Sequence, residues 1–268
     1  MDALDEDIGS GDLTTSALLT GGESGTGRTV AKSEVVIAGI DVFREVFHAF
    51  DNELDFMAYL RDGEVASPGN VIAEVSGRLQ SILTSERVAL NFFQRMCGIA
   101  TLTRKFVDMI TGTKAKILDT RKTVAGHRDL DKYAVTVGGG QNHRLGLDGG
   151  VMIKDNHIIA AGNITKAVQL AATAIPPTIK IEVEVKNQEE AVEALAAGAD
   201  IIMLDNMSIS EMKKAVSLID GRALIEASGN VTLSNVREIA QTGVDFISVG
   251  ALTHSVAAAD LSLTIVAE

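Results

Sequence analysis

The C-terminal half of the chain repeats one strand-and-helix unit, and this repeat restricts the possible folds more than any other feature. After an apolar run at 151–154, runs rich in β-branched residues recur about every 22 residues, at 179–185, 201–205, 223–228 and 246–250. Stretches with helical periodicity separate them, at 188–197, 210–218 and 233–242. Units of this length are typical of parallel strands with helices outside them.

The boundaries of these helices carry their own signals. Asn187 and Ser208 stand where N-caps belong, because their side-chain oxygens can accept a backbone N–H of the first turn. Gly198, Gly221 and Gly243 stand where the helices should stop. Alternating strands and helices are therefore predicted through most of this half.

Polar residues at the predicted strand ends bear on the choice between a barrel and an open doubly wound sheet, which periodicity leaves open. In a barrel these ends converge on one face and form the active site, whereas an open sheet spreads them along an edge. Six such residues favour the barrel: Asp119, Lys154, Glu184, Asp205, Ser228 and Gly250.

The first part of the chain shows no regular repeat and is predicted to be a separate α+β domain. Strand-like runs lie at 29–40 and 71–76, and helical segments at 41–50 and 85–110. A turn-rich stretch lies at 62–70. We place the boundary near 97–101. The expected domains are 1–98, joined by the C-terminal segment 252–268, and a barrel domain over 99–251.

Positive charge gathers in one window of an acidic protein. The net charge of the chain is −12, yet residues 114–157 hold eight Lys/Arg and five Asp. Arg121 and Lys122 follow a predicted strand, Lys154 ends another, and Arg144 follows the triple glycine at 138–140. Arg suits carboxylates and phosphates because it donates paired hydrogen bonds. Surface salt bridging would explain one such residue, but the group predicts a small polyanionic ligand.

Composition excludes several other classes of protein. No apolar stretch is long enough to span a membrane, and the acidic N-terminus lacks a signal-peptide core. The single cysteine, Cys97, cannot form an internal disulfide. Few aromatics and a net negative charge argue against nucleic-acid binding. We therefore expect a cytoplasmic protein with neither nucleic-acid nor membrane partners.

Acidic and glycine-containing strand ends suggest the rest of the site. Glu182 and Glu184 share one face of a strand and Asp205 ends the next, so these carboxylates could hold Mg²⁺. Ser228-Gly229-Asn230 and Gly250-Ala251 end the last two strands, where barrels commonly bind phosphate. Taken singly, each of these features is as well explained by an ordinary turn or a structural pair of acids.

Several motifs together resemble those of the quinolinate phosphoribosyltransferase family, also called nicotinate-nucleotide pyrophosphorylase. The sequences are DTRKT at 119–123, KYAVTVGGGQNHRLGL at 132–147, IKDNH at 153–157, EVEV at 182–185, LDN at 204–206, EASGN at 226–230 and ISVGALTHS at 247–255. The resemblance extends to EDIGSGDLTT at 6–15, ERVALN at 86–91 and GIATLT at 98–103, and so spans nearly the whole chain.

The resemblance implies an N-terminal α/β sandwich domain, a C-terminal incomplete α/β barrel and a homodimer, or a higher oligomer, with shared active sites. It implies transfer of phosphoribose from phosphoribosyl pyrophosphate to quinolinate, with Mg²⁺ as cofactor, giving nicotinate mononucleotide, pyrophosphate and CO₂ for NAD biosynthesis. The implied quinolinate ligands are Arg121, His143, Arg144 and Lys154, with Arg87 of the partner subunit. The implied cosubstrate ligands are Lys122, Glu184, Asp205, Ser228, Gly229 and Gly250. Catalysis is assigned to Lys154, Glu184 and Asp205, and the metal to Glu184 and Asp205.

The sequence departs from the family pattern at Gln141, at Val124-Ala125 and at Gly149-Gly150, none of which is a proposed contact. Three alternative functions stay open at this point. They are a paralogue of the same fold acting on another anion, of the molybdenum-transport-associated type; a Schiff-base aldolase using Lys154; and a non-catalytic sensor of phosphate ligands.

Overall fold

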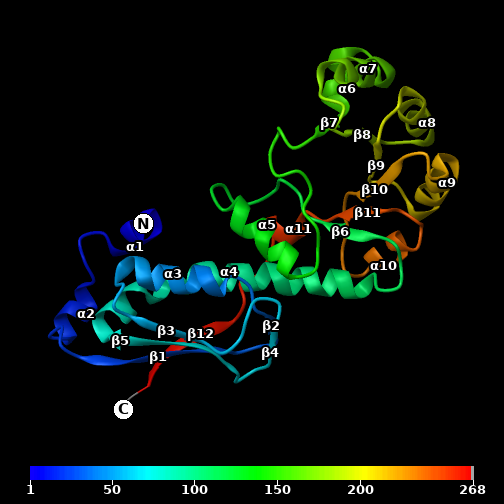
Figure 1. Ribbon diagram of the computed structural model, residues 1–268. Helices are drawn as coiled ribbons and strands as arrows, with labels where there is room; N and C mark the ends of the chain where they lie inside the picture. The colour runs from blue at the N-terminus through cyan, green and yellow to red at the C-terminus, as the bar shows by residue number, and fades with distance from the viewer. Residues whose placement is uncertain (267–268) are drawn as a thin grey trace. The chain divides into compact units, whose positions relative to one another are not determined.

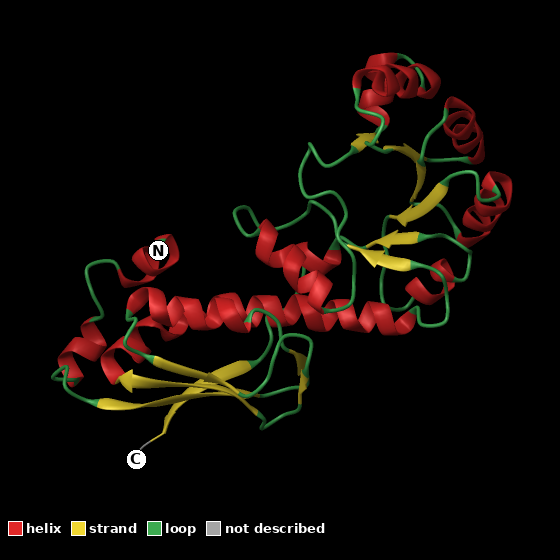
Figure 2. Cartoon of the chain, in the orientation of Figure 1, coloured by secondary structure: helices red, strands yellow, loops and turns green. Residues whose placement is uncertain are grey.

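The computed structural model describes residues 1–266 as two compact units (Figures 1 and 2). The first unit combines Met1–Leu102, Asp129–Gly138 and the C-terminal segment from Val256, and the second combines Thr103–Arg128 and Gly139–Ser255. The C-terminal segment groups with the first unit from Val256, whereas the sequence placed its start at residue 252. The segment Asp129–Gly138 also groups with the first unit, although the sequence placed it in the barrel domain, because its helical pattern carries no information about its packing partner.

The first unit is built on an antiparallel four-stranded sheet with the order β12-β1-β5-β3. Its strands are β1 (Ser24–Ala31), β3 (Asp55–Ala58), β5 (Val71–Arg78) and β12 (Leu261–Val266). The short strands β2 (Val35–Val36) and β4 (Val65–Ala66) pair separately, so the run at 29–40 is two strands and not one. The helices are α1 (Asp2–Ile8), α2 (Leu13–Leu18), α3 (Ile40–Phe50), the first part of α4 (Leu79–Met109) and most of α5 (Arg128–Val137).

An apolar core holds α3 and α4 against this sheet. Phe43 stacks on Phe93 with ring centroids 4.6 Å apart and meets Phe47 edge to face. All three rings are fully buried, in one cluster with Ile72 and Ile82. Aromatic side chains bury large apolar areas, which stabilises a layer of helices on a sheet. The predicted α/β sandwich is confirmed.

The second unit is a parallel six-stranded sheet with the order β6-β11-β10-β9-β8-β7. Its strands are β6 (Lys116–Leu118), β7 (Val151–Ile153), β8 (Ile181–Val185), β9 (Ile201–Asp205), β10 (Leu224–Ser228) and β11 (Phe246–Ser248). In the part of the chain that the structure describes, β6 and β7 end the order without pairing with each other. Figure 1 shows the strands as an open arc with helices on its outer side. The incomplete α/β barrel is therefore confirmed.

The helices of the second unit follow the sequence signals closely. They are α6 (Asp155–Ala161), α7 (Ile164–Ala174), α8 (Gln188–Ala197), α9 (Ile209–Ile219), α10 (Val236–Ala240) and α11 (Ala251–His254). Asn187 and Ser208 are N-caps that accept backbone N–H bonds, as predicted. Gly198 caps α8 in the left-handed conformation, as predicted. The other two predicted stops are displaced: α9 ends at Ile219 and is capped by Asp220, which takes the left-handed conformation itself, and α10 is capped by Gln241, two residues before Gly243. Within 1–266, no helix combines the length and apolar character that crossing a bilayer would need.

Candidate active site

A cavity of about 770 Å³ opens where the strands of the second unit end. Ten of the eleven predicted site residues line it: Arg121, Lys122, His143, Arg144, Lys154, Glu184, Asp205, Ser228, Gly229 and Gly250. The eleventh, Arg87, is an exposed residue of α4 in the first unit. The sequence analysis thus selected residues that the fold brings together around one cavity.

The two-residue repeat of the strands explains this convergence. Met152 on β7, Met203 on β9 and Glu226 on β10 line the cavity, and Lys154, Asp205 and Ser228 follow two residues later on the same faces. In the parallel register, Met203 lies opposite both Glu184 and Glu226. Each strand therefore presents its side chains to the cavity from one face, and the polar ones gather toward the strand ends.

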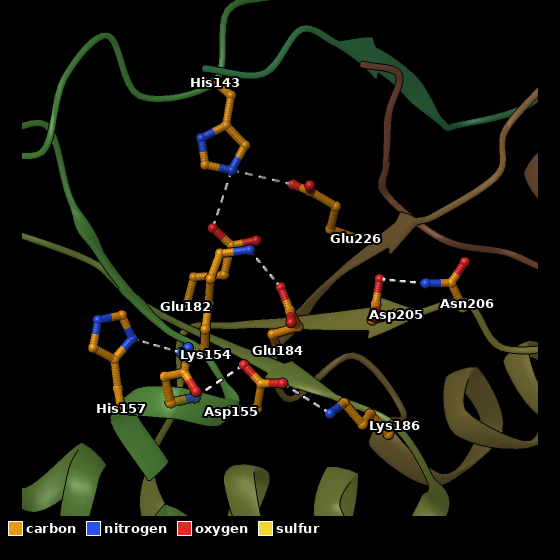
Figure 3. A network of polar contacts seen from close by, with 11 residues as sticks. His143, Lys154, Asp155, His157, Glu182, Glu184, Lys186, Asp205, Asn206 and Glu226 are labelled. Carbon is orange, nitrogen blue, oxygen red and sulfur yellow. Dashed lines mark hydrogen bonds and ion pairs between the residues drawn. The ribbon is translucent and has the colours of Figure 1, made fainter. Parts of the chain in front are cut away.

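Lys154 and Glu184 form an ion pair at the end of β7 and β8, with Nζ and Oε2 2.6 Å apart (Figure 3). The lysine side chain is 45% exposed and the glutamate side chain 12%. On the next strand, Asp205 Oδ1 accepts a hydrogen bond of 3.0 Å from Asn206 Nδ2. This part of the cavity therefore combines one cation with two carboxylates, all partly accessible.

A second group of ionisable side chains, the buried cluster of His143, Glu182 and Glu226, lies deeper (Figure 3). His143 Nε2 lies 3.1 Å from Glu182 Oε2 and 3.7 Å from Glu226 Oε2. The two carboxylates are 5% and 1% exposed. Burial, and next the charge of Glu182, raise the pKa of Glu226 to about 8. His143 and the Ser248 hydroxyl oppose this rise.

The other nitrogen of His143 is also engaged. The backbone N–H of Arg144 donates to His143 Nδ1 over 2.7 Å, and the backbone N–H of His143 donates to Asp119 Oδ1 over 2.8 Å. The family resemblance predicts that His143 is one of four groups around the quinolinate carboxylates. In this structure both ring nitrogens already have protein partners.

Two arginines, Arg121 and Arg144, line the cavity wall. Burial and the nearby charge of Arg121 lower the pKa of Arg144. The Arg144 guanidinium donates to the Gly150 carbonyl over 2.8 Å, and a Cβ on Gly149 would lie 3.2 Å from Arg144 Cβ. Two guanidinium groups repel each other, and an anion bound between them would offset that repulsion. This pair of arginines therefore indicates an anion site. Gly149, a departure from the family pattern, lies in close contact with Arg144.

The ends of β9 and β10 form a tight polar corner. Asn206 Oδ1 accepts from Asn230 Nδ2 over 2.9 Å, and its backbone N–H donates to the Ser228 carbonyl over 2.9 Å. Gly229 has φ 96°, and a Cβ there would lie 2.3 Å from Asn206 Oδ1. Only glycine fits this position, because a side chain would be strained and would also clash.

Contacts among backbone and side chains also shape the Gly250 side of the cavity. The Thr253 hydroxyl donates to the Lys122 carbonyl over 2.9 Å. A Cβ on Gly250 would lie 3.2 Å from Lys122 Cδ and 3.1 Å from His254 Nε2. The absence of a side chain at Gly250 therefore leaves room for two basic side chains beside it.

Glu226 and Asn206 are among the lining residues that sequence reasoning missed. Glu226 lies two residues before Ser228, just as Glu182 lies two residues before Glu184, so the same alternation could have identified it. Asn206 follows Asp205 directly, but its left-handed backbone and its double hydrogen bonding have no sequence signal. Gln141 contributes through its backbone, which bonds to β6, while its side chain is exposed.

Comparison with known proteins identifies the family. Residues 99–264 match the family described as quinolinate phosphoribosyl transferase, C-terminal domain, and residues 12–97 match its N-terminal domain. A probable nicotinate-nucleotide pyrophosphorylase [carboxylating] of Synechocystis is 48% identical, over 98% of this chain and 90% of its own length. The Bacillus subtilis protein of the same description is 44% identical, over 97% of this chain and 90% of its length.

A solved structure agrees with these sequence matches. NadC from Streptococcus pyogenes superimposes with a TM-score of 0.94 at 42% identity, covering 98% of this chain and 93% of that one. Both the sequence and the fold thus match over nearly the full length. The chain belongs to the quinolinate phosphoribosyl transferase family.

Proposed function

We propose that the protein transfers phosphoribose from phosphoribosyl pyrophosphate to the ring nitrogen of quinolinate. Loss of CO₂ then gives nicotinate mononucleotide, with pyrophosphate as the other product, on a route to NAD. Family membership and the cavity chemistry support this reaction. The single observation that carries the proposal is the convergence of Arg121, Lys122, Arg144 and Lys154 on one cavity of a chain with net charge −12.

The quinolinate end of the cavity is assigned to Arg121, Arg144 and Lys154, with His143 beside them. Quinolinate carries two adjacent carboxylates, and guanidinium groups bind carboxylates through paired, charge-assisted hydrogen bonds. The proximity of Arg121 and Arg144 supports the assignment, because a dianion between them relieves their repulsion. His143 contributes by holding the Arg144 backbone.

The phosphoribosyl end is assigned to Lys122, Glu184 and Asp205. Loss of pyrophosphate leaves positive charge on the ribose, and carboxylates in a sheltered site stabilise it. The 5′-phosphate is assigned to Ser228, Gly229 and Gly250, where glycine lets the backbone N–H groups approach closely. Once the ring nitrogen bonds to ribose it becomes cationic, and it then stabilises the electron pair that departing CO₂ leaves on the adjacent ring carbon, which takes up a proton from water to give the product.

Mg²⁺ is the proposed cofactor, and the residues present fit it. Mg²⁺ is held in many enzymes by one or two carboxylates together with substrate phosphates, and Glu184 and Asp205 offer two carboxylates on neighbouring strand ends. When bound, the ion would neutralise charge on the leaving pyrophosphate. Orientation of Asp205 by Asn206 supports this role, since a fixed carboxylate is a better ligand.

Arg87 leads to the proposal of a shared active site in a homodimer. It is exposed on α4 and lies outside the cavity lining of its own chain, so it is available to a partner subunit. Mixing inactive Arg87→Ala protein with inactive Arg144→Ala protein should restore part of the activity if each site takes Arg87 of the partner subunit. No recovery after proven subunit exchange would contradict sharing.

The test of the reaction is incubation with quinolinate, phosphoribosyl pyrophosphate and Mg²⁺, following nicotinate mononucleotide and CO₂. Nicotinate, which lacks one carboxylate, should be a poor substitute, and a chelator should stop turnover. Borohydride with a carbonyl substrate should trap no adduct on Lys154, because the proposed reaction forms no Schiff base and Lys154 Nζ is already paired with Glu184 Oε2. Pyrophosphate release would exclude a non-catalytic sensor.

A further inference from the structure

The two carboxyl groups of the buried cluster, Glu182 and Glu226, have no role in the reaction proposed above, although Glu226 lines the same cavity as His143. Two of their oxygens, Glu182 Oε1 and Glu226 Oε1, have no hydrogen-bond partner within the described chain. Buried polar groups without partners cost free energy, and ionised ones cost more. The positions of the protons in this cluster decide how much negative charge lies next to the ligand site.

A proton placed on either Glu226 or His143 gives two arrangements of equal total charge. In the first, Glu226 is a neutral acid and His143 is a neutral imidazole. In the second, Glu226 is a carboxylate and His143 is an imidazolium. The two differ in the position of one proton, which lies on the Glu226 carboxyl in the first arrangement and on His143 Nδ1 in the second, so that Nδ1 carries a lone pair only in the first.

The hydrogen bonds favour the first arrangement. The Arg144 backbone N–H points at His143 Nδ1 over 2.7 Å, and an N–H can donate only to a nitrogen that bears a lone pair. The remaining ring proton is then on Nε2, where it donates to Glu182 Oε2 over 3.1 Å. In the second arrangement two N–H groups would face each other across 2.7 Å.

The surroundings of Glu226 agree with a neutral acid. Glu182 faces it from β8 and His143 from the loop after α5, while Ser248 on β11 offers only a hydroxyl. Its register neighbours on β9 and β11 are Met203 and Phe246, neither of which titrates. Burial and the charge of Glu182 both raise the pKa of Glu226, in the direction the hydrogen bonds require.

We propose that Glu226 is a positioning residue that holds a proton in the working enzyme, keeps His143 neutral and so fixes Arg144 at the quinolinate end of the cavity. The proposal deepens the proposed function and rests on it. The chain of contacts runs from Glu226 through His143 to the Arg144 backbone, and the Arg144 guanidinium is fixed in turn on the Gly150 carbonyl. Loss of the Glu226 proton would add a second negative charge beneath the site that receives a dianion.

The first test measures quinolinate binding by calorimetry from about pH 6 to about pH 10, where an acid of raised pKa ionises. Wild-type affinity should be steady at neutral pH and then fall by up to about tenfold per pH unit once Glu226 ionises. Glu226→Gln, which has a similar shape and never ionises, should bind like wild type at pH 7 and keep its affinity at alkaline pH. An unchanged alkaline loss in Glu226→Gln, or no binding at pH 7 by a folded variant, would overturn the proposal.

A second test needs no variant of Glu226. In ¹⁵N-labelled wild-type protein at pH 7, the His143 ring, assigned by its absence from His143→Gln, should show one proton, on Nε2. An imidazolium would overturn the proposal. Loss of the Nε2 proton on adding Zn²⁺ or Mg²⁺, with one ion bound per chain, would also overturn it, because the cluster would then be a metal site. If wild-type protein bound no quinolinate at any pH, the proposed function would fail, and the ring signal would still decide the state of His143.

Discussion

Glu182 and Glu184 lie two residues apart on the same face of β8, yet their surroundings balance charge in opposite ways. Glu184 meets the Lys154 ammonium at 2.6 Å in a partly exposed ion pair. Glu182 lies in the buried cluster, where its neighbours are a histidine and a second carboxyl. The accessible level of the cavity, formed by Lys154 and Glu184, suits a cation, because the partly exposed Lys154 ammonium can exchange Glu184 for a ligand. The buried level, formed by the cluster of His143, Glu182 and Glu226, suits a proton, because a proton neutralises Glu226 without needing space or water.

The largest expected effect comes from removing the cation at the accessible level. Lys154→Ala takes away a carboxylate ligand and leaves Glu184 without its partner beside an incoming dianion. The loss of one preorganised electrostatic group in a site is worth roughly 10²–10³-fold in turnover. We expect kcat/KM to fall by about that factor while the circular dichroism spectrum and Tm stay close to wild type.

The matched control for Lys154 is Lys186→Ala. Lys186 forms an exposed ion pair with Asp155 at 3.0 Å, and exposed pairs contribute little. Its activity should change by less than about twofold. A collapse of the folded state in Lys154→Ala would assign Lys154 a structural role, and an equal activity loss in both variants would remove any distinction between the two lysines.

Arg144 lines the cavity and its backbone N–H is bonded to His143 of the buried cluster, so it joins the two levels. Arg144→Ala should have the next largest effect. Loss of a sheltered, charge-assisted contact costs about 1.5–3 kcal/mol, or roughly ten- to 100-fold in the KM for quinolinate. The KM for phosphoribosyl pyrophosphate should change much less. Arg128→Ala is the control, because Arg128 bonds the Thr123 hydroxyl and the Leu145 carbonyl and is not among the cavity-lining residues. Equal losses for both substrates would contradict the division of the cavity into two ends.

The strand ends were predictable from the sequence because parallel strands obey one geometric rule. Lys154, Glu184, Asp205 and Ser228 each follow an apolar β-branched run, and such ends converge in a barrel whatever the packing details. The caps at Asn187 and Ser208 were predictable for the same reason, since capping depends only on nearby residues.

The protonation of the buried cluster was not predictable in this way. It depends on three segments far apart in the sequence, around His143, Glu182 and Glu226, meeting within hydrogen-bonding distance. The grouping of Asp129–Gly138 with the first unit is a similar case. Its buried Asp131 forms a bidentate pair with Arg95, at 2.7 and 2.8 Å, and no local pattern announces a partner 36 residues away.

A smaller effect should appear in thermal stability, and its pH dependence should distinguish the buried Glu226 from the accessible Glu184. The pKa of Glu226 is raised, so the folded chain keeps a proton that the unfolded chain releases from about pH 4.5 upward. The native state therefore binds more protons, and stability falls as pH rises from about 4.5 to about 8. Glu226→Gln has no such proton, so its Tm should exceed that of wild type by a few degrees, about 2–5 °C, at pH 8 and above.

The Tm advantage of Glu226→Gln should shrink toward pH 5, where wild-type Glu226 is protonated in both states. Glu184→Gln is the control at the accessible level, where the partner Lys154 is exposed enough to be solvated. Its Tm difference from wild type should stay nearly constant across the same pH range. A constant difference in Glu226→Gln as well would show that burial does not raise the affinity of Glu226 for its proton.

The smallest expected effect concerns the corner formed by Asn206, Asp205 and Asn230. Removing the Asn206 side chain frees Asp205 Oδ1 and Asn230 Nδ2, and one or two exposed hydrogen bonds are worth about 1 kcal/mol, or roughly fivefold in the KM for phosphoribosyl pyrophosphate. Asn206→Ala also places alanine at φ 54°, which costs stability, whereas Asn206→Gly deletes the same side chain without that strain. Both variants should show the same change in KM, and only the alanine variant should lose Tm. A KM change confined to Asn206→Ala would mean that backbone geometry, and not the side-chain hydrogen bonds, holds Asp205 in place.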